Sequence, residues 1–248
     1  MNVRLTAVIA IATAASLCAQ SAPAPQGRGT AKAGAPIDLT GYWVSIVTED
    51  WRYRMVTPAK GDYASVPLNA EGKKAADAWD PAKDEAAGEQ CRSYGAPAIM
   101  RVPGRLHITW EDDNTLRVDT DAGKQTRLFH FDGKAPSGAP QWQGFSVAKW
   151  EIPGSGRGQN VAARGGSLKV VTTHIRPGYL RKNGVPYSAD AVLTEFYSRT
   201  AEPNGDSWLI VTTVVEDPKY LTQPFITSTH FRLQPDSAGW NPQPCTSR

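Results

Sequence analysis

The sequence lacks the short motifs that mark several large enzyme classes. It contains no GxSxG, P-loop, GxGxxG or HExxH pattern, so the hydrolases, nucleotide-binding enzymes, Rossmann oxidoreductases and zinc proteases that carry them lose their strongest support. It also lacks an excess of charge of one sign, because 27 Lys and Arg residues face 24 Asp and Glu residues and leave a net charge of +3. This balance is too small for a nucleic-acid-binding surface, and we expect no nucleic acid among the partners.

A hydrophobic run long enough to span a membrane is also missing. The apolar run near the start of the chain covers 13 residues, 5–17, whereas a membrane-spanning helix needs about 20. It follows Arg4 and is succeeded by Cys18 and Ala19, which is the pattern of a signal peptide with a small residue at the cleavage position. We therefore predict a signal peptide over residues 1–19 and an exported protein, periplasmic or secreted, with no membrane span.

The next segment, residues 20–37, is rich in Ala, Pro, Gly and Ser and has no hydrophobic periodicity, which predicts a disordered leader. We assign residues 38–248 to a single domain, since no internal linker is long enough to separate two. Lipidation of Cys18 stays open as an alternative, although Leu17 is larger than the residue that normally precedes a lipidated cysteine.

Cysteine is scarce, with three in the chain, and removal of the signal peptide leaves Cys91 and Cys245. An even number of cysteines in an oxidising compartment predicts a disulfide. Loop-closure entropy gives such a long-range bridge an upper value of about 4–5 kcal/mol. The alternative, two free thiols that bind metal or act as a nucleophile, has no CxxC spacing or neighbouring His to support it.

The second half of the mature chain contains a series of short alternating runs. They read LKVVTTHIRPGYL, AVLTEFYSRT, WLIVTTVVED and FITSTHFRL, and Pro, Gly or Asn separates them. Alternation with period two predicts antiparallel strands with one covered face. Further runs lie between residues 99 and 152, so that eight or more strands follow one another. Closure of such a sheet removes its edges, which predicts an all-β antiparallel barrel.

Two other segments complete the predicted architecture. Residues 69–79 are rich in Ala, Lys and Glu, begin with Asn69 as a cap and are followed by Pro81, which predicts one short surface helix. Residues 46–56 continue the alternation of the first strand, with Trp51 and Tyr53 on one face. We predict that this stretch is strand and that this face contacts a ligand.

The first strand opens with Gly41-Tyr42-Trp43, which resembles the Gly-x-Trp opening of the lipocalin and wider calycin barrels. In those barrels the Trp packs across the base. The longer blocks PLNAEGKKAADAWDP, CRSYGAPAIM, QGFSVAKWE, NGVPYSADAVLTEFYSR and VVEDPKYLTQPF, in this order, resemble a family of uncharacterised exported bacterial proteins. That resemblance implies an exported all-β protein and transfers no catalytic residues. Members of the family often have His where this chain has Phe145.

Three ionisable residues interrupt the alternating runs, namely His174, Glu195 and His230. Strand parity allows all three to point into one cavity, where a His and a Glu in hydrogen-bond reach form an acid–base pair near neutral pH. The alternative is that each is a hydrogen-bonded residue on a partly exposed strand. A metal site would use the same three residues, but no tight His spacing supports it. We predict these three as catalytic candidates, with no metal and no cofactor.

Six further residues are predicted to contact a ligand. Trp51, Tyr53 and Trp150 lie on the predicted inner faces, and Arg127 is either a carboxylate-binding residue or a solvated strand residue. The loop over residues 176–187 contributes Tyr179 and Tyr187, which could close over an aromatic ligand. In that arrangement Arg176 or Arg181, from the same loop, would hold an acidic group of the ligand.

Three hypotheses of function follow from these residues. The first is an exported calycin-like barrel that binds a small, partly apolar or aromatic organic molecule in a central cavity. The second is a cofactor-free lyase, isomerase or hydratase that uses a His/Glu pair. The third is an interaction module of the cell envelope without a ligand. The sequence makes no prediction of the oligomeric state.

Overall fold

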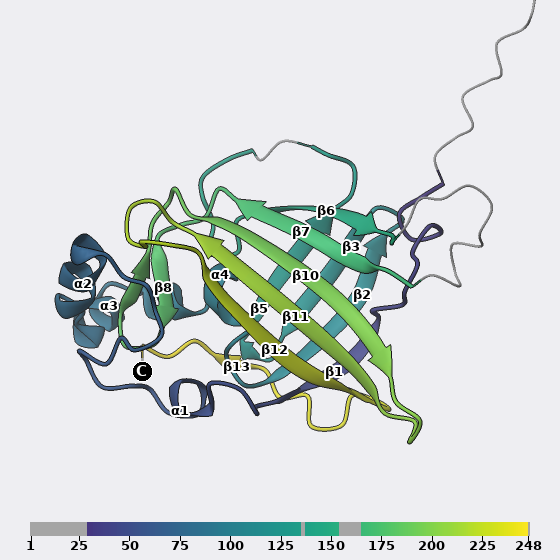
Figure 1. Cartoon of the computed structure of the whole chain (residues 1–248), viewed down its shortest axis with the longest axis horizontal. Coiled ribbons are helices and arrows are strands. Elements are labelled where there is room, and N and C mark those ends of the chain that lie inside the picture. Colours follow the sequence, from purple (N-terminus) through teal and green to yellow (C-terminus); the bar gives the residue numbers. More distant parts are fainter. Residues whose placement is uncertain (1–28, 135–136, 154–164, 248) are drawn as a thin grey trace, which may run out of the picture.

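The structure of the protein is a computed structural model that describes residues 29–134, 137–153 and 165–247. Within these residues, nine strands form a closed barrel in the order β1-β12-β11-β10-β7-β6-β5-β3-β2, which confirms the predicted all-β barrel of eight or more strands (Figure 1). The barrel strands are β1 (Gly41–Ile46), β2 (Arg105–Asp112), β3 (Thr115–Thr120), β5 (Gln125–His130), β6 (Phe145–Glu151), β7 (Ser167–Thr173), β10 (Val192–Ala201), β11 (Ser207–Glu216) and β12 (Phe225–Gln234).

One seam of the barrel differs from the antiparallel prediction. Strands β5 and β6 pair in parallel, with Phe129 opposite Ser146 and His130 opposite Val147. The other barrel neighbours pair antiparallel. Parallel neighbours need a crossover connection rather than a tight hairpin, and the chain between β5 and β6, residues 131–144, is long enough to supply it.

The barrel interior is packed with side chains. In β10, for example, Leu193, Glu195 and Tyr197 alternate inward with exposed fractions of 0–1%. Trp43 from the Gly-x-Trp opening is wholly buried in this core, and its indole Nε1 donates to the Leu39 carbonyl at 3.0 Å. Phe129 also lies in the core, and its ring centroid is 5.4 Å from that of Tyr197. The alternating runs therefore form a filled core of the kind that stabilises small barrels.

The predicted surface helix is present as α2 (Ala70–Asp77). Asn69 caps it as expected, because its Oδ1 accepts a hydrogen bond from the Gly72 amide at 2.8 Å. The other helical segments are shorter: α1 (Trp51–Arg54), η1 (Gln90–Ser93), α3 (Pro81–Ala86) and α4 (Ala96–Ile99). Helices α2 and α3 lie at one end of the barrel, with α1 and the strand β8 (Gly178–Arg181) nearby, and β8 pairs with β9 (Val185–Tyr187) (Figure 1).

The prediction that residues 46–56 continue the first strand is wrong. Strand β1 ends at Ile46, and after a turn the chain forms the single helical turn α1. Asp50, directly before α1, has a φ angle of 49°, in the left-handed region, which is not a strand conformation. Alternation over a short polar stretch did not distinguish a strand from a turn followed by a helix.

The leader is ordered where the structure describes it. Residues 29–37 were predicted to be disordered, but the Lys32 amide donates to the Asp113 carbonyl at 3.0 Å, and Trp150 Nε1 donates to the Ala31 carbonyl at 2.9 Å. These bonds hold the segment against the barrel. The predicted signal peptide, residues 1–19, and residues 20–28 of the leader lie outside the described residues.

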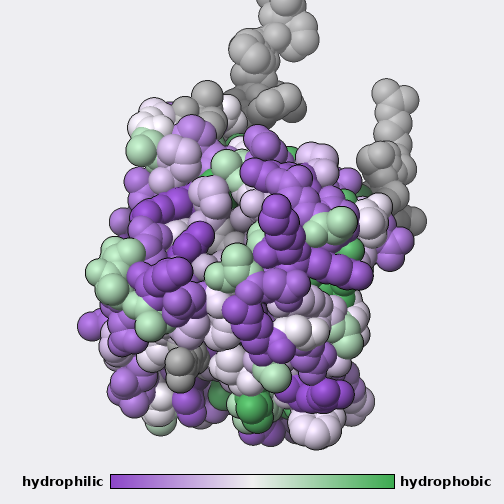
Figure 2. Space-filling model, turned by 90° about the vertical axis from the view of Figure 1, so that its left-hand side faces the viewer, coloured by the Kyte–Doolittle hydropathy of each residue, from purple (hydrophilic) through white to green (hydrophobic). Residues whose placement is uncertain are grey.

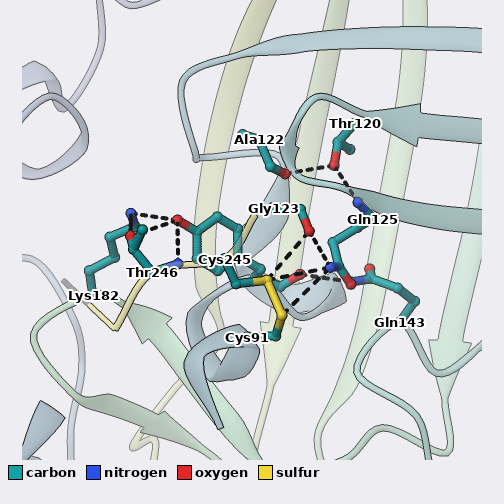
Figure 3. Close-up of a disulfide and its surroundings, with 10 residues drawn as sticks. Cys91, Thr120, Ala122, Gly123, Gln125, Gln143, Lys182, Cys245 and Thr246 are labelled. Atoms are coloured by element: carbon teal, nitrogen blue, oxygen red, sulfur yellow. Dashed lines mark hydrogen bonds between the residues drawn. A yellow bond between two sulfur atoms is a disulfide. The ribbon is translucent and has the colours of Figure 1, made fainter. Parts of the chain in front are cut away.

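The predicted disulfide joins Cys91, in η1, to Cys245, with the Cα atoms 5.1 Å apart and a sequence separation of 154. It holds the C-terminal segment, including β13 (Gln243–Pro244), beside β4 (Ala122–Gly123), with which β13 pairs in parallel. Figure 3 shows the bridge and the hydrogen bonds around it. Among the described residues, no helix is long and apolar enough to cross a membrane.

Candidate functional site

The three predicted catalytic residues do not lie together. Glu195 points into the barrel and has no exposed surface. His230 lies on the outer face of β12, where its Nδ1 is 3.0 Å from Oε2 of Glu49. His174 follows the end of β7 with a φ angle of 58°, and its Nε2 is 2.8 Å from the Gly138 carbonyl oxygen. The barrel wall separates Glu195 from His230, so the predicted His/Glu cavity does not form.

The partner of Glu195 is Arg127. Two terminal guanidinium nitrogens of Arg127 donate to the two carboxylate oxygens of Glu195, at 2.9 and 2.6 Å, and both side chains have no exposed surface. Tyr197 and Thr172 complete the group, at 3.3 Å from the guanidinium. Burial alone would lower the pKa of Arg127, but the Glu195 carboxylate raises it above the ordinary value. Arg127 is therefore neither a solvated strand residue nor free for a ligand carboxylate.

The predicted ligand-contacting aromatics do not form one site, although Tyr179 and Tyr187 line a smaller pocket of about 240 Å³ together. Trp51 is 63% exposed, and Trp150 packs on Phe131 while it binds the leader. The Tyr179 hydroxyl donates to Asp84 at 2.9 Å, outside the barrel. Tyr187 is 1% exposed, and burial raises its pKa above the ordinary value.

Tyr53 alone among these six residues lines a pocket of about 460 Å³ at the end of the barrel. The pocket lies between α1, the segment from η1 to the start of β2, strands β4 and β8, and the C-terminal segment. The apolar part of its lining includes Tyr53, Met55, Ala98, Val102, Pro103 and Leu180. The charged part includes Arg54, Arg101, Asp121, Arg181 and Lys182. A cavity that joins apolar walls with a few convergent polar groups is the usual form of a small-molecule site.

The buried cations of this pocket are Arg54, Arg101 and Arg181, with exposed fractions of 8%, 5% and 4%. Arg101 Nη1 donates to the Asp50 carboxylate at 3.0 Å, and Arg181 Nη1 donates to the Ala64 carbonyl at 2.7 Å. Among the described residues, Nη2 of Arg101 and both Nε and Nη2 of Arg181 have no hydrogen-bond partner. Burial, and secondly the charge of Arg101, lower the pKa of Arg181 to about 10.

Arg54 supports this arrangement, and each of its three guanidinium nitrogens already has a partner. Its Nε donates to the Arg101 carbonyl at 2.9 Å, one terminal nitrogen bonds Glu49, and the other donates to Ser45 Oγ at 3.2 Å. Burial lowers the pKa of Arg54, and the Glu49 carboxylate opposes that effect. Because it holds the backbone at Arg101, Arg54 positions the neighbouring guanidinium.

The disulfide fixes another wall of the pocket. Lys182 Nζ donates to the Tyr94 hydroxyl at 2.7 Å and to Thr246 Oγ1 at 3.2 Å, directly after Cys245 (Figure 3). Burial raises the pKa of Tyr94, but the bonds from Lys182 and Thr246 outweigh it and lower the pKa overall. The Tyr94 ring lies against Gly123, where an added Cβ would be 2.3 Å from the ring, so only glycine fits this wall.

The helical end of the molecule has a mainly hydrophilic surface. Figure 2 shows that face, with small hydrophobic areas scattered among polar ones. Within the described part of the chain, no group of three or more His, Cys, Asp or Glu residues is arranged to hold a metal ion. No family model, curated protein or solved structure matches this chain.

Sequence reasoning identified part of this pocket. It named Arg181 as a candidate for an acidic group of a ligand, and Tyr53 as a ligand contact. It missed Arg101, although an arginine directly after the apolar run in APAIMR is a detectable signal of a buried charge. Its other candidate, Arg176, instead pairs with Glu89 and lies over the Trp142 ring.

Proposed function

We propose that this is an exported β-barrel protein that binds a small, partly apolar organic molecule in the pocket at the end of the barrel. The observation that carries the proposal is the cavity of about 460 Å³, in which apolar walls meet three buried arginines. A volume in this range is typical of small-molecule sites. The packed barrel interior favours this pocket over the central cavity expected from the sequence.

Export is supported by two features of the chain. The first is the signal-peptide pattern of residues 1–19. The second is the Cys91–Cys245 disulfide, which persists in an oxidising compartment. The acid–base alternative has no comparable support, because His174, Glu195 and His230 have separate partners.

The test is native mass spectrometry of the mature protein purified from the periplasm of its own cells, with a denatured control. We expect an organic molecule of low mass that stays with the folded protein and is lost on denaturation. The variant Met55→Asp, which places a charge on the apolar wall, should lower the occupancy, because Met55 lines the pocket.

The matched control is Val147→Asp. Val147 is 39% exposed on the outer face of β6 and does not line the pocket. The Val147→Asp variant should therefore retain as much bound organic molecule as the unmodified protein. A mature protein that is empty, and that gains no mass from a periplasmic extract, would contradict the proposal and favour the interaction module.

A further inference from the structure

We infer that the pocket selects organic anions, and that Arg101 and Arg181 hold a carboxylate or a chemically similar oxyanion while the apolar walls hold the rest of the molecule. This inference rests on the proposed function, because it names the ligand class of the same pocket. It is carried by two buried guanidinium groups that leave three nitrogen donors without a partner among the described residues.

Arg101 and Arg181 bring two positive charges close together. Arg101 and Arg181 share a neighbour, since their guanidinium carbons lie 5.6 and 6.0 Å from the Phe225 ring centroid. Buried charges are normally paired, because the loss of hydration is costly. Asp50 accepts a hydrogen bond from one nitrogen of Arg101, whereas Arg181 donates to the neutral carbonyl of Ala64. The charges of Asp50 and Asp62 also act on Arg181, but these carboxylates bond Arg101 and Arg52. Among the described residues, no carboxylate accepts a hydrogen bond from Arg181 itself.

The two guanidinium groups also have nitrogens that make no hydrogen bond to the described residues. A guanidinium group presents its N–H donors in a planar fork that matches the two oxygens of a carboxylate, or two oxygens of a phosphate or sulfonate. The partnerless atoms are Nη2 of Arg101 and Nε with Nη2 of Arg181. The pair on Arg181 is adjacent on one edge of the group, which suits a bidentate acceptor. Both arginines line the pocket, so an oxyanion bound there lies beside their guanidinium groups.

Apolar and aromatic side chains lie beside the guanidinium groups in the pocket. Arg181 lies over the Tyr53 ring, at 4.2 Å from the centroid, and Tyr53, Met55 and Leu180 line the same pocket. Guanidinium groups stack on aromatic rings and at the same time bind anions. A molecule with one flat apolar part and one oxyanion satisfies both halves of this lining.

The test compares two fluorescent probes with the same aromatic framework. 1-Anilinonaphthalene-8-sulfonate carries a sulfonate, and N-phenyl-1-naphthylamine is its neutral counterpart. The full mature protein should bind the sulfonate at least about tenfold more tightly. The variants Arg181→Gln and Arg101→Gln should weaken binding of the sulfonate by about 10- to 100-fold and leave binding of the amine unchanged.

A second measurement uses the unmodified protein, so that the test survives if a variant fails to fold. Benzoate should displace the bound sulfonate probe and benzamide should not, because the two compounds differ mainly in charge. Inorganic phosphate is added separately, and displacement by phosphate but not by benzoate would show that the pocket takes an inorganic oxyanion and would overturn the inference of an organic anion.

The outcomes separate the two proposals. If the neutral probe binds as well as the sulfonate and benzamide competes as well as benzoate, the anion inference fails while the pocket stands. If neither probe binds and native mass spectrometry finds an empty protein, the proposed function itself fails. Selective binding of the sulfonate that the arginine variants remove supports both.

Discussion

The protein buries arginine in two ways, and the contrast separates stability from binding. Inside the barrel, Arg127 meets Glu195 through two parallel hydrogen bonds, and both side chains have no exposed surface. At the barrel end, Arg101 and Arg181 are nearly as buried. Among the described residues they leave three nitrogens without partners, whereas Arg127 leaves one, its Nε. A buried charge whose partner belongs to the chain is part of the fold. Arg181 instead donates to a neutral carbonyl, and from this buried charge, together with Arg101 beside it, we infer the place of a ligand anion.

The largest expected effect comes from breaking the internal pair. Replacing the carboxylate in Glu195→Gln leaves the Arg127 charge buried without a counter-ion, which should lower the free energy of unfolding by about 3–5 kcal/mol. Urea denaturation measures the change. The double variant Glu195→Leu with Arg127→Met should recover most of the loss, because it removes both charges. Equal stability of Glu195→Gln and the unmodified protein would show that the pair is not needed for the fold.

The next effect concerns the disulfide beside the pocket. Cys91→Ser with Cys245→Ser removes a bridge across 154 residues, which should lower the free energy of unfolding by about 2–4 kcal/mol. It also releases the wall formed by Tyr94, Lys182 and Thr246, so binding of the sulfonate probe should weaken in the folded variant. The Arg127–Glu195 pair lies elsewhere and should be unaffected. Unchanged probe affinity would show that the C-terminal wall does not shape the pocket.

A smaller effect should appear at alkaline pH. Burial, together with the charge of Arg101, lowers the pKa of Arg181 to about 10. The folded protein without ligand releases this proton at lower pH than the unfolded chain, so the contribution of Arg181 to the free energy of unfolding rises as the pH passes 10. Affinity for an anion moves in the opposite direction and should fall between pH 9.5 and about 11.

Titration of the two naphthalene probes between pH 8 and 11 checks this prediction. The sulfonate should lose up to about tenfold in affinity for each pH unit above 10, while the neutral amine should bind equally well throughout. A parallel loss of both probes would indicate general loosening of the protein, and no loss of either would show that Arg181 does not hold the sulfonate.

The sequence was sufficient for features that depend on local pattern. Alternation predicted the barrel strands, Asn69 predicted the start of α2, and the count of cysteines predicted the bridge. Strand parity also placed Glu195 inside the barrel. Its partner was not predictable, because the contact with Arg127 joins residues 68 apart in sequence and depends on which strands face each other across the barrel.

Features set by long-range register or by turns escaped prediction for the same reason. The parallel seam between β5 and β6 depends on the path of the chain between them. The helical turn α1 follows from the left-handed conformation of Asp50, which an alternating pattern does not encode. The pocket combines residues from five separate segments, so only single members such as Tyr53 and Arg181 were recognisable in advance.

The smallest expected effect comes from replacing His230 on the outer face of the barrel, because its ion pair is partly exposed and both arginine sites are buried. His230 bonds Glu49 there, and the two side chains are 32% and 25% exposed. A partly exposed pair of this kind contributes less than about 1 kcal/mol, so His230→Gln should lower the free energy of unfolding by no more than that. Probe affinity should not change, because Arg54 keeps its bonds to Ser45 and to the Arg101 carbonyl. A large loss of ligand binding in His230→Gln would instead connect the outer face to the pocket through Glu49 and Arg54, and would restore His230 as a site residue.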